Sequence, residues 1–213
     1  IKGTAKVLSQ YADILMIRTD SHKDINEFKK YLEIPIINGL TNLSHPCQIM
    51  SDILTFEELK GEIEGKTIAW LGDGNNVANS FIEAATKFKF ELKIACPKKY
   101  QPNKKIIEAA KKNNCKLLIT EDPHKAARDA DCIMTDKWIS MGDKGDKKKK
   151  KKVLKKYQVN RKIMKSAKSD AIFMHCLPAK RGSEVTKEVV DNKKNSIVFE
   201  QAENRLHIQN AIV

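Results

Sequence analysis

The sequence TIAWLGDGNNVANS, residues 67–80, joins an apolar run to a glycine-containing turn and then to residues that favour a helix. The run lacks strict alternation of polar and apolar residues, which is typical of a strand buried on both faces of a parallel sheet. Gly72 and Gly74 permit a tight turn, and Asn75 or Asn76 can cap the following helix. We therefore predict a strand that feeds a helix, whose free amides could receive an anion.

The two glycines resemble only half of a dinucleotide-binding pattern. The acidic residue expected about twenty positions later falls instead among Ala95, Cys96 and Pro97. We therefore do not expect a nicotinamide cofactor.

The composition is that of a chain able to bury a core. The sequence has 213 residues and five cysteines, which are odd in number, widely spaced and without a metal-like pair. This usage favours a reducing compartment and predicts no metal site. No apolar run approaches the roughly twenty residues of a membrane span. Because the first residue is Ile1, we expect that the chain lacks its natural start.

The positive charge is unevenly distributed. Lysine and arginine number 40 against 27 acidic residues, for a net charge of +13, which invites a nucleic-acid interpretation. Nine lysines, however, lie between Lys144 and Lys156, with Lys147 to Lys152 unbroken. Such a run is typical of an exposed, mobile surface. With no zinc spacing, helix-turn-helix signal or aromatic RNA-binding pattern, we expect no nucleic-acid partner, although binding of an acidic surface by this run stays open.

Strand-like and helix-like segments alternate along the chain. The predicted strands are residues 12–18, 35–39, 67–71, 92–95, 116–119, 132–135, 171–174 and 196–199. The predicted helices are residues 24–32, 45–61, 77–88, 104–112 and 200–212, with a brief turn at 123–128. This alternation predicts an α/β fold, a doubly wound parallel sheet with helices on both faces. Functional side chains should then gather at the carboxyl ends of the strands.

Several polar residues occupy such ends. Arg18 closes one strand, Asp136 follows another directly, and Cys176 follows a third. Two of them have a plainer interpretation: Arg18 as a surface arginine, and Cys176 as a packed rather than a reactive thiol. The loop that contains residues 140–142 is either a lid or a simple surface excursion.

Two helices carry further candidates. His45 and Gln48 are three residues apart, so both project from one face at the start of a helix and could hold a small polar ligand. His45 could also be a lone capping residue. Arg205, in the last helix, could reach an anion or merely pair with Glu203.

Five segments together resemble the ornithine carbamoyltransferase family, in the family's order and across nearly the whole chain. They are HPCQ at 45–48, GDGNN at 72–76, TDKWISMG at 135–142, HCLP at 175–178 and AENR at 202–205. The resemblance implies that residues 1–44 are the C-terminal part of a carbamoyl-phosphate domain. It further implies an interdomain helix at 45–61, an ornithine domain at 62–199 and a shortened returning helix at 200–213.

The resemblance also implies the site. Carbamoyl phosphate would be held by Arg18, His45, Gln48, Arg205 and the backbone of Cys176 and Leu177. Ornithine would be held by Asn76, Asp136, Ser140 and Met141. The residues implied in catalysis are Cys176, Asp136, His45 and Arg18. Attack of the side-chain amine on the carbonyl carbon would give citrulline and phosphate, without metal or cofactor. The family further implies a homotrimer, in the cytoplasm or the mitochondrial matrix.

One feature of the family is absent. The phosphate-binding sequence Ser-x-Arg-Thr occurs nowhere in the chain, so we expect it upstream of Ile1 and expect the given chain to be weakly active or inactive. A non-catalytic ornithine-binding protein is therefore an alternative. Putrescine is an alternative substrate, although it lacks the α-carboxylate that Asn76 and the 140–142 loop would bind. Aspartate fits less well, since its second carboxylate needs more cationic donors.

Overall fold

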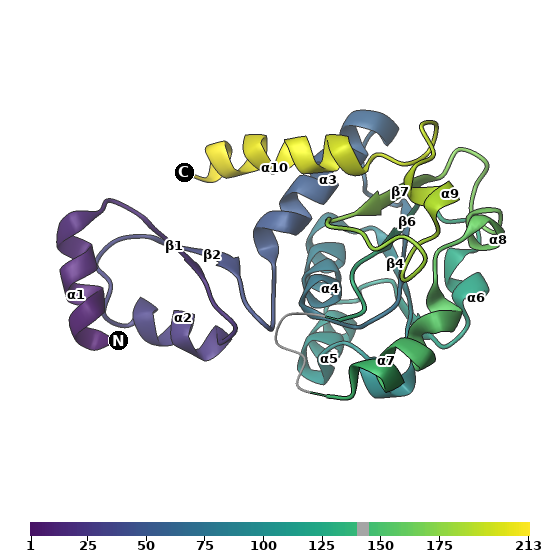
Figure 1. Ribbon diagram of the computed structural model, residues 1–213. Helices are drawn as coiled ribbons and strands as arrows, with labels where there is room; N and C mark the ends of the chain where they lie inside the picture. Colours follow the sequence, from purple (N-terminus) through teal and green to yellow (C-terminus); the bar gives the residue numbers. More distant parts are fainter. Residues whose placement is uncertain (140–144) are drawn as a thin grey trace.

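The computed structural model describes residues 1–139 and 145–213, which form two α/β parts joined by a helix (Figure 1). The smaller part contains α1 (Lys2–Tyr11), β1 (Leu15–Arg18), α2 (His22–Lys29) and β2 (Ile36–Leu40). Strands β1 and β2 pair in parallel. Helix α3 (Pro46–Lys60) leads from them into the larger part, so it starts where the two parts meet.

The larger part is built on a parallel sheet in the order β5-β4-β3-β6-β7. Its strands are β3 (Thr67–Leu71), β4 (Glu91–Ala95), β5 (Leu117–Thr120), β6 (Cys132–Thr135) and β7 (Ile172–His175). The chain winds outward from β3 to β5, and then returns to the other side of β3 for β6. This order confirms the predicted α/β sheet and places the switch point between β3 and β6, where such folds form a ligand crevice.

Helices cover both faces of this sheet. They are α4 (Asn76–Phe88), α5 (Lys104–Lys112), α6 (Pro123–Ala127), α7 (Lys147–Leu154), α8 (Arg161–Met164), α9 (Lys187–Val190) and α10 (Val198–Ile212), with short 3₁₀ turns at Lys98–Tyr100 and Lys155–Tyr157. Among the described residues we find no helix with the length and apolar character of a membrane span.

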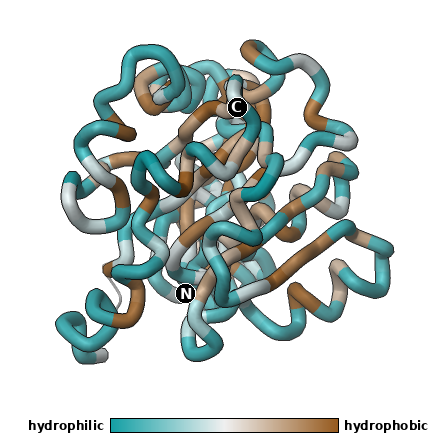
Figure 2. Tube along the Cα trace, turned by 90° about the vertical axis from the view of Figure 1, so that its right-hand side faces the viewer, coloured by the Kyte–Doolittle hydropathy of each residue, from teal (hydrophilic) through white to brown (hydrophobic). Residues whose placement is uncertain are grey.

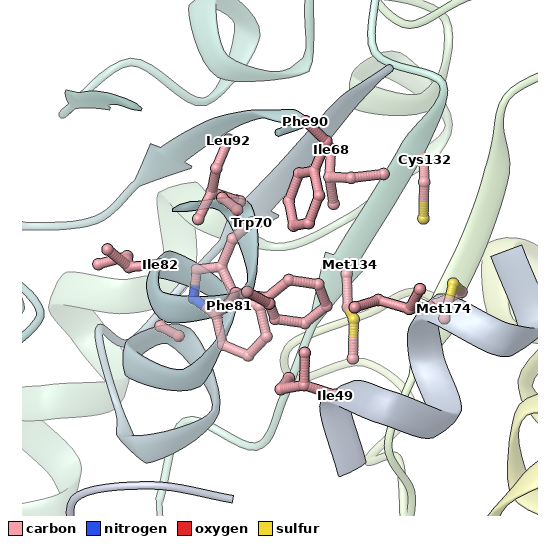
Figure 3. Packing of buried hydrophobic residues seen from close by; sticks show 14 of the residues in the cluster. Ile49, Ile68, Trp70, Phe81, Ile82, Phe90, Leu92, Cys132, Met134 and Met174 are labelled. Carbon is pink, nitrogen blue, oxygen red and sulfur yellow. The ribbon is translucent and has the colours of Figure 1, made fainter. Parts of the chain in front are cut away.

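Alternate residues of the strands supply two cores. On one face, Ile68 and Trp70 of β3 pack with Ile49 of α3 and Phe81 of α4, and the ring centroids of Trp70 and Phe81 lie 5.9 Å apart (Figure 3). On the other face, Ala69 and Leu71 pack with residues of α6, α7, α8 and α9. Because both faces are covered, β3, β6 and β7 are mostly apolar, and Figure 2 shows hydrophobic segments of the chain in the interior of the molecule.

The turn after β3 depends on its glycines for different reasons. Gly72 has a φ of 129°, a conformation that favours glycine. A Cβ at Gly74 would lie 2.5 Å from the carbonyl carbon of Gln101 and closer still to Pro102. Asn75 caps α4, since its side chain accepts hydrogen bonds from the backbone N–H groups of Val77 and Ala78. Gly74 therefore permits a close chain crossing.

Two predictions about local structure need correction. Residues 196–199 do not form a strand: only Ser196 bridges to Phe173, and α10 begins at Val198 rather than at Glu200. The Lys147–Lys152 run lies in α7, capped by Asp146, and is exposed as predicted except at Lys150. Lys150 is buried there, and its Nζ lies 2.6 Å from Asp73 Oδ2. Both corrections come from tertiary packing, which local composition does not record.

Candidate active site at the carboxyl edge of the sheet

The turns after β3 and β6 face each other across the switch point. Asn75 Nδ2, at the start of α4, donates a hydrogen bond of 2.8 Å to Asp136 Oδ2. From the end of β7, Cys176 Sγ donates to the other carboxylate oxygen, Asp136 Oδ1, over 3.1 Å. Three strand ends thus bring an amide, a thiol and a carboxylate together, and Asp136 remains half-buried.

Cys176 is present as a thiol rather than a thiolate. Burial, followed by the neighbouring Asp136 carboxylate, raises the pKa of this thiol well above its ordinary value. A thiol can donate to a carboxylate, whereas a thiolate beside it would be repelled. Of the two interpretations, the structure therefore supports the packed, hydrogen-bonding cysteine over the reactive nucleophile.

A second group forms where α3 and α10 approach each other. Arg205 Nη1, from α10, donates to Gln48 Oε1 over 2.6 Å and lies 3.4 Å from His45 Nε2. His45 is the residue before α3 and Gln48 lies in its first turn. The backbone N–H of His45 also donates to Ser80 Oγ of α4, over 2.8 Å. Arg205 therefore does not simply pair with Glu203, and His45 makes no side-chain cap.

The imidazole of His45 is neutral. Burial, then the charges of Arg205 and Arg18, lower the pKa of His45 to about 3. Since a guanidinium carries only donors, His45 Nε2 must accept from Arg205, which puts the ring proton on Nδ1. Nδ1 is buried without a hydrogen-bond partner among the described residues, as is Arg205 Nε. Both are donors that a ligand could satisfy.

Arg18 and Asn76 lie where the two parts of the molecule meet. Arg18 is exposed at the end of β1, and its charge helps to lower the pKa of His45. Asn76 Nδ2 donates to the backbone oxygen of Thr41 over 2.7 Å, which ties α4 to the smaller part. Ser140 and Met141 lie outside the described residues.

The backbone after β7 turns sharply. Leu177 has a φ of 50°, and its N–H donates to His175 Nδ1 over 2.9 Å. Within the described chain, we find no hydrogen bond to the carbonyl oxygens of Cys176 and Leu177. The turn therefore offers acceptors to a ligand, while the Leu177 amide is already engaged.

Asp136, His175 and Cys176 each offer one side-chain atom that can bind a metal, and these three atoms lie within 4.8 Å of one another. The ring of His175 is fully buried, with Nδ1 bonded to Leu177 and Nε2 lying 3.5 Å from Glu184 Oε1. Nδ1 is thus engaged with the Leu177 amide, whereas Nε2 faces Glu184 and makes no hydrogen bond among the described residues. The expectation of chemistry without a metal stays a prediction.

Sequence reasoning missed several residues that shape the site. Asn75 was expected only as a cap, yet it also holds Asp136. Asp52 is buried and accepts hydrogen bonds from Gln48 and from Gln201 of α10. Asp52 lies four residues after Gln48, a spacing that places both on one helix face, which was the available signal. Nothing local pointed to Gln201.

A cavity of about 530 Å³ lies elsewhere, lined by Arg161, Lys165, Phe173 and Glu188 among others. Ala171, just before β7, also lines it, so the cavity lies toward the amino end of that strand and away from Cys176. Because none of the clustered polar residues lines it, we do not assign the site to this cavity.

Two family descriptions match the chain. Residues 1–58 match the carbamoyl-P binding domain of aspartate/ornithine carbamoyltransferase, and residues 64–213 match its Asp/Orn binding domain. The first match ends near the end of α3, and the second begins shortly before β3 of the larger part.

Named relatives agree with these matches. The chain is 51% identical over its 213 residues to an ornithine carbamoyltransferase of Nitrobacter winogradskyi and 52% identical to one of Brucella abortus, and spans 68% of each. The solved structure of the Pyrococcus furiosus enzyme superposes with a TM-score of 0.93 at 45% identity, over 99% of this chain and 68% of that one. The anabolic enzyme of Campylobacter jejuni gives 0.94 at 36% identity, over 99% and 71%. With both domain models and full-length relatives in agreement, the chain belongs to the aspartate/ornithine carbamoyltransferase family.

Proposed function

We propose that the protein is an ornithine carbamoyltransferase, which transfers the carbamoyl group of carbamoyl phosphate to the side-chain amine of L-ornithine. A C–N bond forms at the carbonyl carbon, the C–O bond to phosphate breaks, and citrulline and phosphate leave. The observation that carries this proposal is the contact of Arg205 with His45 and Gln48, in which His45 Nδ1 and Arg205 Nε are buried donors without a hydrogen-bond partner among the described residues. Such donors suit a carbonyl oxygen that gains negative charge on attack.

The carbamoyl group is held by neutral and cationic donors. His45 Nδ1–H and the guanidinium of Arg205 donate toward the carbonyl oxygen, and Arg18 supplies a second positive charge from β1. A neutral His45 can stay beside two arginines without repulsion, which the low pKa of its ring supports. Gln48 holds Arg205 in place, and the carbonyl oxygens of Cys176 and Leu177 accept from the carbamoyl amino group.

The amine of ornithine is held by Asp136. Asn75 and Cys176 each donate to one oxygen of this carboxylate, so its position is fixed before substrate arrives. Asp136 attracts the cationic side chain, and the amine must lose a proton before it attacks. Asn76, Ser140 and Met141 would then bind the amino-acid end. A single acid among neutral polar groups suits a cationic amino acid better than aspartate.

We further propose a homotrimer that acts without a metal, cofactor, nucleic acid or membrane. We place it in the cytoplasm, or in the mitochondrial matrix if the source is a eukaryote. The five cysteines of the chain are all free, which suits a reducing compartment. Sedimentation velocity would test the assembly, and a monomer at micromolar concentration would contradict it.

Steady-state assays test the reaction. The chain should form citrulline from carbamoyl phosphate and ornithine, and putrescine or aspartate should replace ornithine poorly. Because Ser-x-Arg-Thr is absent from the 213 residues, we expect a low rate, which should rise when a segment carrying this sequence precedes Ile1. Preference for putrescine, or ornithine binding with no turnover in either form, would contradict the proposal.

A further inference from the structure

Asp52 is a buried acid that the proposed reaction does not use. It lies in α3 and is 1% exposed. Its Oδ1 accepts two hydrogen bonds, from Gln48 Nε2 over 2.8 Å and from Gln201 Nε2 over 2.7 Å. One carboxylate oxygen thus joins the first turn of α3 to the first turn of α10.

These two bonds decide which way each amide points. An amide that turns its NH₂ group toward Asp52 must turn its oxygen away. Gln48 Oε1 then accepts from Arg205 Nη1, over 2.6 Å, and Gln201 Oε1 accepts from the backbone N–H of His175, over 2.8 Å. A flipped Gln48 would face the guanidinium with donors and could not bind it.

From this network we infer that Asp52 is a positioning residue for carbamoyl transfer: it orients Gln48, and through Gln48 it holds Arg205 over the carbonyl oxygen. The same carboxylate orients Gln201, which holds the start of the turn that carries Cys176 and Leu177. This inference rests on the proposed function. Its particular content is that Asp52 acts through an amide and does not touch the substrate.

The charge state of Asp52 does not decide its action. Burial raises its pKa to about 7, while hydrogen bonds from Gln201 and Gln48 and the charge of Arg205 oppose this rise. Asp136 adds to the rise, and Cys132 and Cys176 lie within reach of its charge. Oδ2 lacks a hydrogen-bond partner among the described residues, so a proton would sit there. Oδ1 remains an acceptor on either side of this pKa.

The chain offers a matched control on the same two helices. Thr55 Oγ1, also in α3 and fully buried, accepts from Asn204 Nδ2 of α10 over 3.0 Å. Thr55→Val removes this bridge with little change in volume and leaves Gln48 untouched. A loss common to Asp52→Ala and Thr55→Val would reflect looser helix packing, whereas a loss confined to Asp52→Ala reflects positioning.

Three variants, Asp52→Ala, Asp52→Asn and Thr55→Val, should be compared with the parent chain. In ¹⁵N-labelled protein without ligand, the side-chain amide signals of Gln48 and Gln201, assigned by substitution, report on the network directly. Asp52→Ala should shift both signals toward solvent-exposed values and raise the KM or the Kd for carbamoyl phosphate about tenfold, as expected from one lost hydrogen bond. Asp52→Asn, whose amide oxygen still accepts, should restore most of the affinity, and Thr55→Val should keep it.

Two results would overturn the inference: unchanged Gln48 signals and affinity in Asp52→Ala, or equal losses of affinity in Asp52→Ala and Thr55→Val. Failure of Asp52→Asn to restore affinity would also overturn it, since charge rather than orientation would then matter. If the parent chain neither binds carbamoyl phosphate nor forms citrulline, the proposed function fails. The amide signals still decide separately whether Asp52 orients Gln48.

Discussion

Replacing Lys150 by methionine should destabilise the protein far more than replacing its neighbour Lys149. Both residues lie in the same unbroken lysine run of α7, and methionine and lysine have similar helix propensities. Lys150 is buried, with Nζ 2.6 Å from Asp73 Oδ2 and 5.1 Å from the centroid of the Tyr100 ring. Lys149 is exposed. The comparison therefore separates burial and pairing from charge and composition.

The magnitude follows from the burial of the pair. The side chains of Lys150 and Asp73 are 9% and 10% exposed, so removing the cation leaves a buried carboxylate without this ion pair. Breaking a buried pair on one side typically costs about 3–5 kcal/mol, whereas an exposed lysine changes stability by about 0.5 kcal/mol or less. We expect about 3 kcal/mol for Lys150→Met, because methionine keeps the apolar contacts of the lysine stem.

Urea unfolding followed by circular dichroism measures both variants. A matched double variant, Lys150→Met with Asp73→Asn, should recover part of the loss, since no charge is then left buried. Equal unfolding midpoints for Lys150→Met and Lys149→Met would refute the reasoning, as they would show that the whole run behaves as a solvated surface. Citrulline formation should fall as well in Lys150→Met, because Asp73 belongs to the turn whose Asn75 holds Asp136.

Three further predictions concern single positions. Gly74→Ala should cost about 2 kcal/mol or more on urea unfolding, because its Cβ would overlap the chain at Pro102; a neutral result would show that the two segments separate readily. Cys176→Ala should lower kcat about tenfold or more, with little change in the KM for carbamoyl phosphate, since Asp136 loses one of its two orienting donors; an unchanged kcat would remove Cys176 from the mechanism. The folded-state pKa of His45, about 3, lies below its ordinary value of 6.5, so the unfolded chain binds a proton that the folded chain does not. The free energy of unfolding therefore decreases as the pH falls below 6.5. Between pH 7.5 and 5 the stability advantage of the parent over His45→Asn should shrink by about 2 kcal/mol, and a constant difference would contradict the low pKa.

The architecture could be predicted because its signals are local. Buried parallel strands are apolar runs, and the helices between them have recognisable starts. The sheet and its ligand-facing edge can therefore be predicted from residues 67–80 and from the other apolar runs that precede helices. The strand predicted at residues 196–199 was wrong because an apolar run of this length does not distinguish a strand from the first turn of a buried helix. Only the packing of α10 against α3 decides between them.

The residues of the candidate site could be predicted from the sequence, but the hydrogen bonds between them could not. Asp136 and Cys176 follow strands directly, so their nearness is a consequence of the sheet order. The bond from Asn75 to Asp136 joins side chains 61 residues apart in sequence, and the bond from Arg205 to Gln48 joins side chains 157 residues apart. No local pattern records such partners. Lys150 shows the same limit. It is one of six identical lysines in the run, and its contacts with Asp73 and Tyr100 distinguish it.

The two groups of polar side chains differ in charge, as two substrates of opposite charge require. Arg18 and Arg205 lie toward the smaller part and α10, around a histidine that they keep neutral, and suit an anion. Asp136 lies at the switch point with donors on both oxygens, and suits a cation. Asp52 lies between the two groups, because it bonds to Gln48 on one side and its charge acts on Cys176 on the other. Oδ1 of Asp52 can accept from Gln48 and Gln201 whether or not the acid is protonated, which is why we expect the orientation of Gln48 to matter more than the charge of Asp52.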